Sequence, residues 1–350
     1  MRGGLERHKA QRSASVASSG VPQVTQPAEP RNSICFQQSA QKLCTSSTMT
    51  PQPAQRGGSA KSSTQCATLL IADVACISTL VGPPRPPHKL RVAKALFDMK
   101  LRALRRDRAW RTGRELFLHE RVFEDCLDRI ALIQRKFHSA LLIGCPDPGW
   151  HQRLGDLVGT VDIIEPGPLF AGTAGAQQVA EDQFEPRIGA FDLCIAVGTL
   201  DTVNDLPKAL QLVRASLKED SLFIGALAGG ESVPQLRRAM HAADQTTGAA
   251  APRVHPRIEA AALAPLLNAR GFIKPVVDID RVQVSYESLD GLVSDLRGMA
   301  ATNILVARSR KPLSRGARVA AAEAFRLGGD GSRTVETFEL LHFAAWTPAG

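Results

Sequence analysis

The segment from Phe191 to Gly230 constrains the fold more than any other part of the sequence. Phe191–Gly198 is a nearly continuous apolar run, typical of a central parallel strand that is buried on both faces. Apolar residues at helical spacing follow, with Asn204 and Asp205 as candidate N-caps. A second apolar run, Ser221–Leu227, predicts the next strand. Together they form a βαβ unit, and ligands of such sheets bind beyond the carboxyl ends of the strands.

The charge of the chain is unevenly distributed along its 350 residues. The net charge is +9, but residues 1–94 contain 12 Lys or Arg and three Asp or Glu, whereas the remainder contains 31 residues of each sign. The basic excess therefore lies in the leader, and we do not expect the folded part to bind nucleic acid. The ordered pattern begins near Lys94, which leaves room for one elaborated α/β domain.

Residues 1–93 are predicted to form a disordered basic leader, because they are rich in Ser, Gln, Pro and Thr and lack hydrophobic periodicity. The apolar stretch Cys66–Val81 contains Asp73 and is short for a membrane span, so no transmembrane segment is expected. Two explanations of the leader remain open. It is either a mitochondrial transit peptide or the product of a start assigned too early, with the true start at Met49 or later. The poor transit pattern favours a bacterial cytoplasm over a mitochondrial matrix.

Several common catalytic and metal patterns are missing from the sequence. The seven cysteines form no CxxC pair, and the eight histidines form no HxxxH or HxH spacing, so neither a metal site nor a secreted disulfide framework is predicted. Cys194 lies in a predicted buried strand, where it is expected to act as a small apolar filler. Neither a GxSxG nor a P-loop pattern occurs.

Residues 94–137 are predicted to form an N-terminal helical lid. The segment Lys94–Glu115 is basic, and apolar residues at helical spacing predict a helix over Leu116–Phe137. Seven basic residues lie between Lys100 and Arg114. A solvated helix face is the simpler interpretation of these charges, and a lid or a dock for an acidic partner is the functional one.

A candidate cofactor loop follows the first predicted strand, Ala140–Ile143. The turn Gly144–Gly149 opens onto a predicted helix at Trp150–Val158, where free backbone amides can meet the polar end of a cofactor. Two prolines in this turn remove donors. The second predicted strand, Val161–Glu165, ends in a carboxylate that can accept both hydroxyls of a ribose. An ordinary solvated turn acid explains Glu165 equally well.

Beyond Gly230 the pattern predicts further helices and two long strands. The helices are expected at 233–243, 258–270, 289–299 and 315–327, and the strands at Ile273–Tyr286 and Thr334–Trp346. The two strands are expected to form an antiparallel edge on an otherwise parallel sheet. The predicted fold class is therefore α/β, a three-layer sandwich with a mostly parallel, Rossmann-like sheet of seven strands over residues 138–346.

Several segments resemble one branch of the class I S-adenosylmethionine-dependent methyltransferases. That branch contains the respiratory complex I assembly factor that acts as an arginine hydroxylase on a complex I subunit, together with its bacterial relatives. It is related to the malonyl-carrier-protein methyltransferases. The resemblance covers about Ala95 to Trp346, and its most specific segments are VNDLP, GALAGGES and DLRGM with the following Asn303.

The resemblance implies a seven-stranded sheet, S-adenosylmethionine (SAM) over the carboxyl ends of strands one, two and four, and a protein or carrier substrate. By position it implies that nine residues hold the cofactor. They are Gly144, Cys145, Asp147, Gly149, Glu165, Asp182, Val197, Gly198 and Thr199. Glu165 matches the ribose acid, and Asp182 stands where an acid that contacts adenine is expected. No catalytic residue and no metal ligand is identified.

The sequence also departs from the pattern of this branch. Leu142 stands where the strand usually supplies an acidic residue, Pro146 and Pro148 replace loop glycine chemistry, and Asp201 and Thr202 replace the usual His and Trp. The missing carboxylate removes a partner for the amino group of the cofactor. Such a loss costs about 1.5–3 kcal/mol, or roughly ten- to a hundredfold in affinity.

Three functions remain open at this point. The first is a SAM-dependent enzyme that methylates a protein or serves arginine hydroxylation. The second is a non-catalytic assembly factor that has lost SAM binding. The third is a generic small-molecule or carrier-protein methyltransferase. The branch-specific segments favour a complex I type subunit as partner, and we expect Asp295–Met299, Asn303 and the basic stretch Lys100–Arg114 to flank the cofactor mouth and recognise it.

Overall fold

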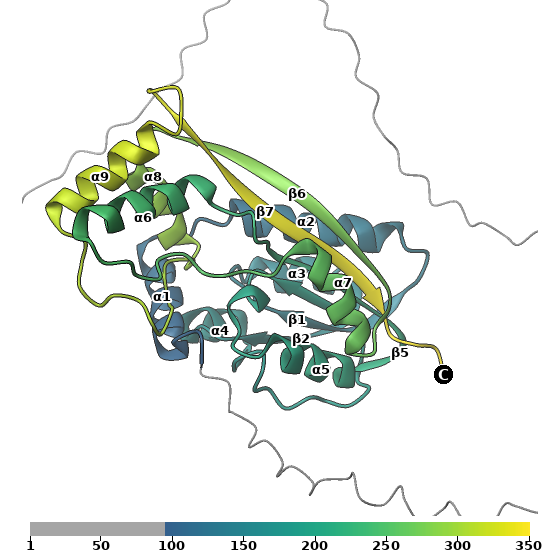
Figure 1. The fold of residues 1–350 in the computed structure, drawn as a ribbon. Coiled ribbons are helices and arrows are strands. Elements are labelled where there is room, and N and C mark those ends of the chain that lie inside the picture. Colours follow the sequence, from purple (N-terminus) through teal and green to yellow (C-terminus); the bar gives the residue numbers. More distant parts are fainter. Residues whose placement is uncertain (1–94) are drawn as a thin grey trace, which may run out of the picture. The chain divides into compact units, whose positions relative to one another are not determined.

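The computed structural model describes residues 95–350, which contain a seven-stranded sheet of order β3-β2-β1-β4-β5-β7-β6 (Figure 1). The strands are β1 (Phe137–Ile143), β2 (Val158–Glu165), β3 (Gln177–Gln178), β4 (Phe191–Val197), β5 (Leu217–Ala228), β6 (Ile273–Tyr286) and β7 (Thr334–Trp346). Strands β1 to β5 pair in parallel, whereas β7 runs antiparallel to both β5 and β6. The predicted fold class and its antiparallel edge are confirmed.

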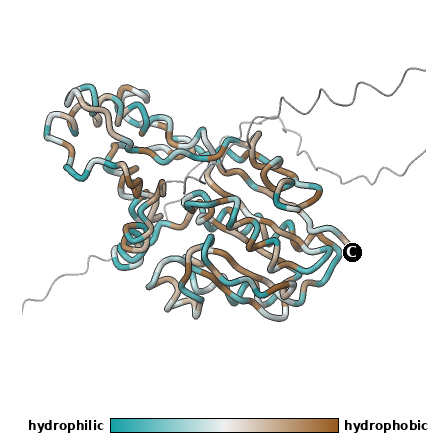
Figure 2. The backbone as a smooth tube through the Cα atoms, turned by 60° about the horizontal axis from the view of Figure 1, so that its bottom comes forward, coloured by the Kyte–Doolittle hydropathy of each residue, from teal (hydrophilic) through white to brown (hydrophobic). Residues whose placement is uncertain are grey.

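Helices cover both faces of the sheet and complete a three-layer sandwich. The helices are α1 (Met99–Thr112), α2 (Phe117–Leu132), α3 (Gly149–Gly155), α4 (Pro168–Ala174), α5 (Leu206–Ser216), α6 (Pro234–Thr247), α7 (Ala260–Ala269), α8 (Leu289–Gly298) and α9 (Arg315–Arg326). On one face, Phe123 of α2 stacks on Trp150 of α3 with 4.3 Å between ring centroids. On the other, Leu210 of α5 and Leu263 of α7 pack on the sheet. Figure 2 shows that the strands between these layers are largely hydrophobic.

Two predicted helix boundaries are wrong for the same physical reason. The helix predicted over Leu116–Phe137 ends at Leu132, and Phe137 begins β1, where it pairs with Val158. Val158, predicted as the end of a helix, begins β2 instead. Both side chains are buried in the core beside the sheet. An apolar residue just after a helix continues the helical spacing, so spacing alone does not separate the last helical turn from the first residue of a strand.

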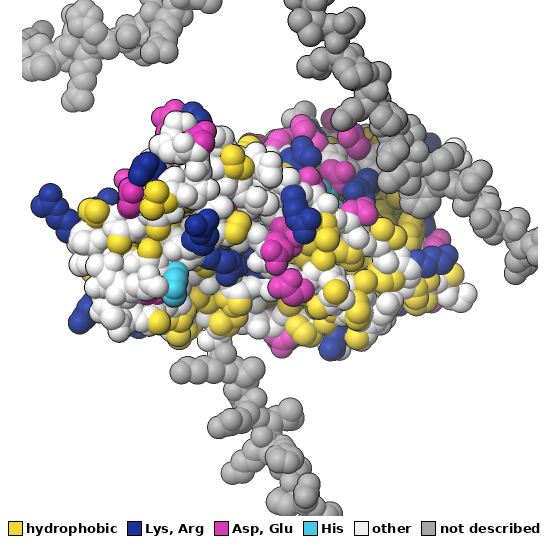
Figure 3. All heavy atoms as spheres, turned by 45° about the horizontal axis from the view of Figure 1, so that its top comes forward, with side chains coloured by type: hydrophobic (Ala, Val, Ile, Leu, Met, Phe, Trp, Pro, Cys, Tyr) yellow, Lys and Arg dark blue, Asp and Glu magenta, His cyan; other side chains and the backbone are white. Residues whose placement is uncertain are grey.

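The carboxyl-terminal part follows the sequence pattern closely. Strands β6 and β7 begin and end at the predicted residues. Helices α6, α8 and α9 gather near one end of this long pair of strands, close to α1 (Figure 1). On the face in Figure 3, acidic and basic side chains are interspersed, as the equal numbers after residue 94 predict.

The predicted leader, residues 1–93, lies outside the described residues. Of the helices between residues 95 and 350, none has the length and apolar character needed to cross a membrane.

Candidate cofactor and substrate site

The candidate site begins where β1 and β4 end side by side, at the point where the strand order reverses. Gly144 follows β1 and Gly198 follows β4, and both adopt positive φ. A Cβ atom on Gly144 would lie 2.6 Å from Cγ2 of Thr199 and 2.7 Å from the carbonyl oxygen of Val197. A Cβ atom on Gly198 would collide with the ring of His119. Glycine is therefore required at both positions, and the two loops are in direct contact.

Glu165, the predicted ribose acid, lies at the end of β2 and is fully buried. Its carboxylate accepts two hydrogen bonds from Arg106 of α1, from Nε at 2.6 Å and from Nη2 at 2.8 Å. It also accepts bonds from the backbone amides of Cys145 at 2.9 Å and Gly167 at 2.7 Å. A carboxylate has about four lone-pair sites, so Glu165 is saturated by groups of its own chain.

A second buried ion pair lies beside the first. Arg102, one turn before Arg106 on α1, donates to Glu181 from Nη1 at 2.7 Å and from Nη2 at 2.8 Å. Arg102 also donates to the carbonyl oxygen of Thr199 at 2.7 Å. Burial alone would raise the pKa of Glu181, but the charge and hydrogen bonds of Arg102 outweigh burial and hold that pKa below its ordinary value. Both members of the pair are therefore ionised.

Helix α1 reaches these carboxylates because the segment before it is tied to the loop after β4. The side chain of Asn204 accepts hydrogen bonds from the amides of Leu96 and Phe97 and donates to the carbonyl oxygen of Phe97. The ring of Phe97 meets His255 edge to face, with 5.3 Å between centroids. Asn204 was a candidate helix cap, but the cap of α5 is Asp205, which accepts from the amide of Lys208 at 2.9 Å.

Several of the remaining predicted cofactor residues form hydrogen bonds within the chain. The Asp147 carboxylate accepts from the amide of Gly149 at 2.8 Å. Burial, followed by the nearby Glu165 carboxylate, raises the pKa of the Cys145 thiol to about 12, so the thiol is protonated. Asp182 is buried, and its Oδ2 accepts from the amide of Asp205 at 3.2 Å. Its other oxygen, Oδ1, is buried without a partner among the described residues.

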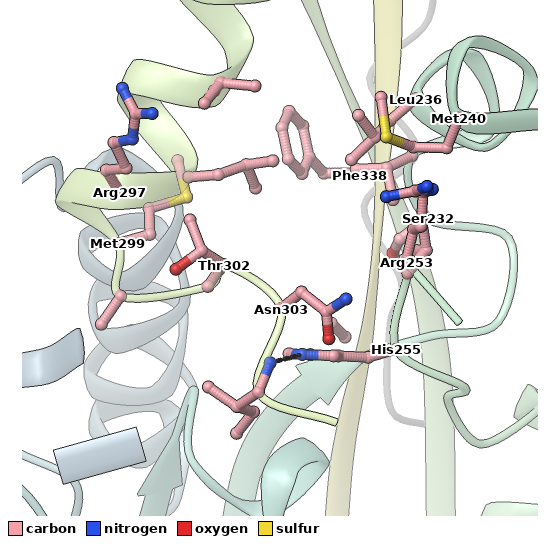
Figure 4. A pocket seen from close by; sticks show the side chains of 18 of the residues that line it. Ser232, Leu236, Met240, Arg253, His255, Arg297, Met299, Thr302, Asn303 and Phe338 are labelled. Carbon is pink, nitrogen blue, oxygen red and sulfur yellow. Dashed lines mark hydrogen bonds between the residues drawn. The ribbon is translucent and has the colours of Figure 1, made fainter. Parts of the chain in front are cut away.

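A large cavity of about 1220 Å³ lies beside these ion pairs, and Arg102 and Arg106 are the α1 residues that line it. Its walls come from α1, α2, the ends of β4 and β5, strand β7 and the helices α6, α8 and α9. In Figure 4, Leu236 and Met240 of α6 lie across the cavity from Met299 and Thr302, with Phe338 of β7 between them. Only two of the nine predicted cofactor residues, Val197 and Gly198, line the cavity. The other seven lie outside its lining.

Two histidines line the cavity, and both are held neutral. Burial, followed by the charge of Arg106, lowers the pKa of His119 to about 4. Burial, followed by the charge of Arg257, lowers the pKa of His255 to about 4. His255 is nearly fully buried, and its Nε2 accepts a hydrogen bond from the amide of Ile304 at 3.0 Å (Figure 4). That bond requires an unprotonated Nε2, which agrees with the lowered pKa.

The residues that depart from the methyltransferase pattern have structural partners. Leu142 is fully buried in the core of β1, between Ile163 and Ile195 on the neighbouring strands. Asp201 forms an ion pair with Arg257 at the cavity wall. Between residues 95 and 350, no cluster of three or more His, Cys, Asp or Glu side chains is suited to hold a metal ion.

Comparison with known proteins identifies relatives that match two thirds to three quarters of this chain, although no family model matches it. The mitochondrial arginine-hydroxylase NDUFAF5 of Mus musculus is 32% identical over 278 residues, which cover 75% of this chain and 80% of the mouse protein. The Danio rerio protein of the same name is 32% identical over 244 residues, 66% of this chain and 75% of its own length. The chain therefore belongs to the NDUFAF5 family. The malonyl-[acyl-carrier protein] O-methyltransferase of Laribacter hongkongensis is a more distant relative of this NDUFAF5 family member, 29% identical over 183 residues, 52% of this chain and 59% of that protein.

SAM is the cofactor that the methyltransferase fold of the NDUFAF5 family implies, and its ribose does not fit the arrangement described here. In the placement that the resemblance implies, the ribose would need free acceptors on Glu165, but Arg106 and two backbone amides occupy all of them. The amide of Cys145, in the predicted cofactor loop, is used in the same network. Asp182 Oδ1 is the exception, since it is a buried acceptor without a donor. Under that placement, an acceptor remains where adenine would lie, while the acceptors for the ribose are occupied.

In this NDUFAF5 family member, sequence reasoning did not foresee the buried pairs Arg102–Glu181 and Arg106–Glu165, and it did not single out His119. The preferred interpretation of the basic helix as a solvated face is wrong for Arg102 and Arg106, which are buried. Their i, i+4 spacing puts both guanidinium groups on one face of α1, and this spacing could have indicated from the sequence that the two side chains act together. Asn303, which was expected to recognise a partner, lines the cavity. Its amide donates to Pro252 O and its oxygen accepts from Leu305 N, which ties its loop to the segment after α6.

Proposed function

We propose that the chain is an assembly factor for a complex I type respiratory dehydrogenase and that it works by binding a segment of a protein in the cavity. Membership of the NDUFAF5 family supports the process. The observation that carries the mode of action is the cavity of about 1220 Å³, which exceeds the 300–1,000 Å³ typical of small-molecule pockets. Its outer walls are α6, α8 and α9. Helix α6 adjoins the branch-specific GALAGGES segment, and α8 carries most of the DLRGM segment.

We propose further that the chain binds its partner without SAM. The support for this is the saturated carboxylate of Glu165. To seat a ribose, Arg106 would have to leave a buried, doubly hydrogen-bonded ion pair. Breaking a buried pair costs about 3–5 kcal/mol, or roughly 200- to 5,000-fold in affinity. Ordinary ligand contacts do not restore that amount unless the displaced guanidinium finds a new anion.

A SAM-dependent modification of the partner is the second candidate function. The unpartnered Oδ1 of Asp182 favours it, because that oxygen can accept a hydrogen bond from an adenine amino group. Methylation and arginine hydroxylation both fall under this candidate. A generic small-molecule or carrier-protein methyltransferase receives less support, because the cavity is larger than such a substrate needs.

Isothermal titration of the purified chain with SAM separates the two candidates. We expect no measurable heat of binding up to millimolar SAM. A dissociation constant in the micromolar range would overturn the SAM-free function and leave the modifying enzyme as the better assignment.

The process is tested separately, in the source organism. Deletion of the gene should lower the amount of assembled complex I, measured by blue native electrophoresis and NADH dehydrogenase activity, and the wild-type gene should restore it. Normal complex I in the deletion strain would refute the assembly role. The proposed compartment is the one in which that complex is assembled, a bacterial cytoplasm or, as the mitochondrial names of the NDUFAF5 relatives suggest, the matrix.

A further inference from the structure

Three arginines lie near one another beside the cavity and form what we call the arginine rim; Arg105 and Arg108 are not part of the cavity lining, and Arg108 reaches it through Thr302. Arg105 and Arg108 come from α1 and Arg297 comes from α8, two helices that pack against each other. Arg297 lines the cavity, and Figure 4 shows its guanidinium turned away from Asn303 and His255 at the cavity floor. Within residues 95–350, none of the three has a carboxylate oxygen within 4.0 Å, although most other arginines of this region do.

The hydrogen-bonding groups of this arginine rim are poorly satisfied. Arg108 makes one long contact, 3.5 Å from Nη2 to Oγ1 of Thr302, which also lines the cavity. The Nε atoms of Arg105 and Arg108 are buried and have no partner among the described residues. On the same helix, Arg102 and Arg106, which line the cavity, each bind a carboxylate with two hydrogen bonds. Arg105 and Arg108 therefore keep guanidinium donors that no group of the described residues satisfies.

The three guanidinium groups also repel one another. Burial, followed by the charges of Arg308 and Arg297, lowers the pKa of Arg105. Burial, followed by the charges of Arg105 and Arg297, lowers the pKa of Arg108. Arg308 is compensated by Asp98 at 3.2 Å, so the uncompensated charge is concentrated on the other three. An anion placed between them would relieve this repulsion.

We infer that Arg105, Arg108 and Arg297 bind the carboxylates of an acidic segment of the protein partner, while an adjacent apolar side chain of that segment enters the cavity. This inference rests on the proposed function, because it takes the ligand of the cavity to be a protein segment. Guanidinium groups match carboxylates through paired, charge-assisted hydrogen bonds. The apolar side chains of Met299 on one side of the cavity and of Leu236 and Met240 on the other suit a neighbouring aliphatic side chain.

The test is a binding measurement with defined peptides. A fluorescein-labelled heptapeptide of sequence LEELEEL is titrated with the full chain and followed by fluorescence anisotropy, beside the matched peptide LQQLQQL. We expect the glutamate peptide to bind at least tenfold more tightly at low salt and to lose that advantage as salt rises. Equal binding of the two peptides would overturn the inference.

Single substitutions then assign the site. Arg105→Gln, Arg108→Gln and Arg297→Gln should each weaken binding of the glutamate peptide about tenfold, the lower end for a charged hydrogen bond. Arg111→Gln is the matched control, since Arg111 lies on the same helix, is exposed and forms only a 3.9 Å pair with Asp107. It should change binding less than twofold. If all four substitutions weaken binding equally, the peptide responds to the overall positive charge of the helix rather than to these three arginines, and the inference is overturned.

Two further arms keep the result interpretable. Arg297 is exposed, so Arg297→Gln should fold normally and tests the site even if a variant of α1 does not. Inorganic phosphate that displaces the peptide at low millimolar concentration would reassign the rim to a phosphoryl group and refute the carboxylate. Peptide binding is independent of the deletion strain, so failure of this inference and failure of the assembly role give different results.

Discussion

Replacing Arg106 with methionine should destabilise the folded domain and, at the same time, open the ribose position. The substitution keeps much of the side-chain volume but removes both hydrogen bonds to Glu165. Glu165 is fully buried, so its charge would be left with only the amides of Cys145 and Gly167. Removing one partner of a buried ion pair costs about 3–5 kcal/mol.

That magnitude translates into a large thermal shift. For domains of 150–250 residues, 1 kcal/mol moves the melting temperature by about 2–4 °C, so Arg106→Met should lower it by about 6–20 °C. The measurement is differential scanning fluorimetry, with urea unfolding to obtain the free energy. Arg187→Met is the control, because Arg187 pairs with Asp162 on the surface, where such pairs contribute about 0–1 kcal/mol.

The double variant Arg106→Met/Glu165→Gln removes the buried charge and should recover part of the lost stability. SAM at millimolar concentration should raise the melting temperature of Arg106→Met, in which Glu165 has free acceptors, but not that of the wild type. The reasoning is refuted if Arg106→Met loses no more stability than Arg187→Met. It is also refuted if SAM stabilises the wild type as much as the variant.

Two further predictions concern the supports of the cavity. The pKa of His255 is lowered from 6.5 to about 4, so its contribution is fully present above pH 6.5 and is lost as pH falls toward 4. Between pH 7.5 and 5, this group should lower the free energy of unfolding by about 2 kcal/mol. Urea unfolding at both pH values should show a smaller drop in His255→Gln than in the wild type. An equal drop in the two proteins would refute the lowered pKa of His255. Asn204→Ala should cost about 1–3 kcal/mol through three lost hydrogen bonds to the segment before α1, measured by urea unfolding. Asn268→Ala, at an exposed position of α7, should change stability by less than about 0.5 kcal/mol, and equal effects of the two substitutions would contradict the tethering role.

Most of the sheet could be predicted from local pattern. Strand β4 is buried at every position and apolar at all but Asp192, because both faces of the sheet are covered. Alternation marked β6, and β7 was also predicted with its observed bounds. The two-residue strand β3 was missed, because Gln177 and Gln178 carry no apolar signal and pair with β2 only through backbone contacts. Such an element depends on its neighbour rather than on its own residues.

The candidate site divides in the same way. The sequence by itself determined which loops end at the ligand-binding edge, because parallel strands of one sheet share the direction of their carboxyl ends, and it put Glu165 at the end of β2. Only the tertiary structure decided what Glu165 binds. Its partner, Arg106, comes from a helix whose position is set by Asn204 and Phe97, and a basic helix pattern does not say which face is buried. A side chain's neighbours across the fold follow from packing between distant segments, and local periodicity carries no information about them.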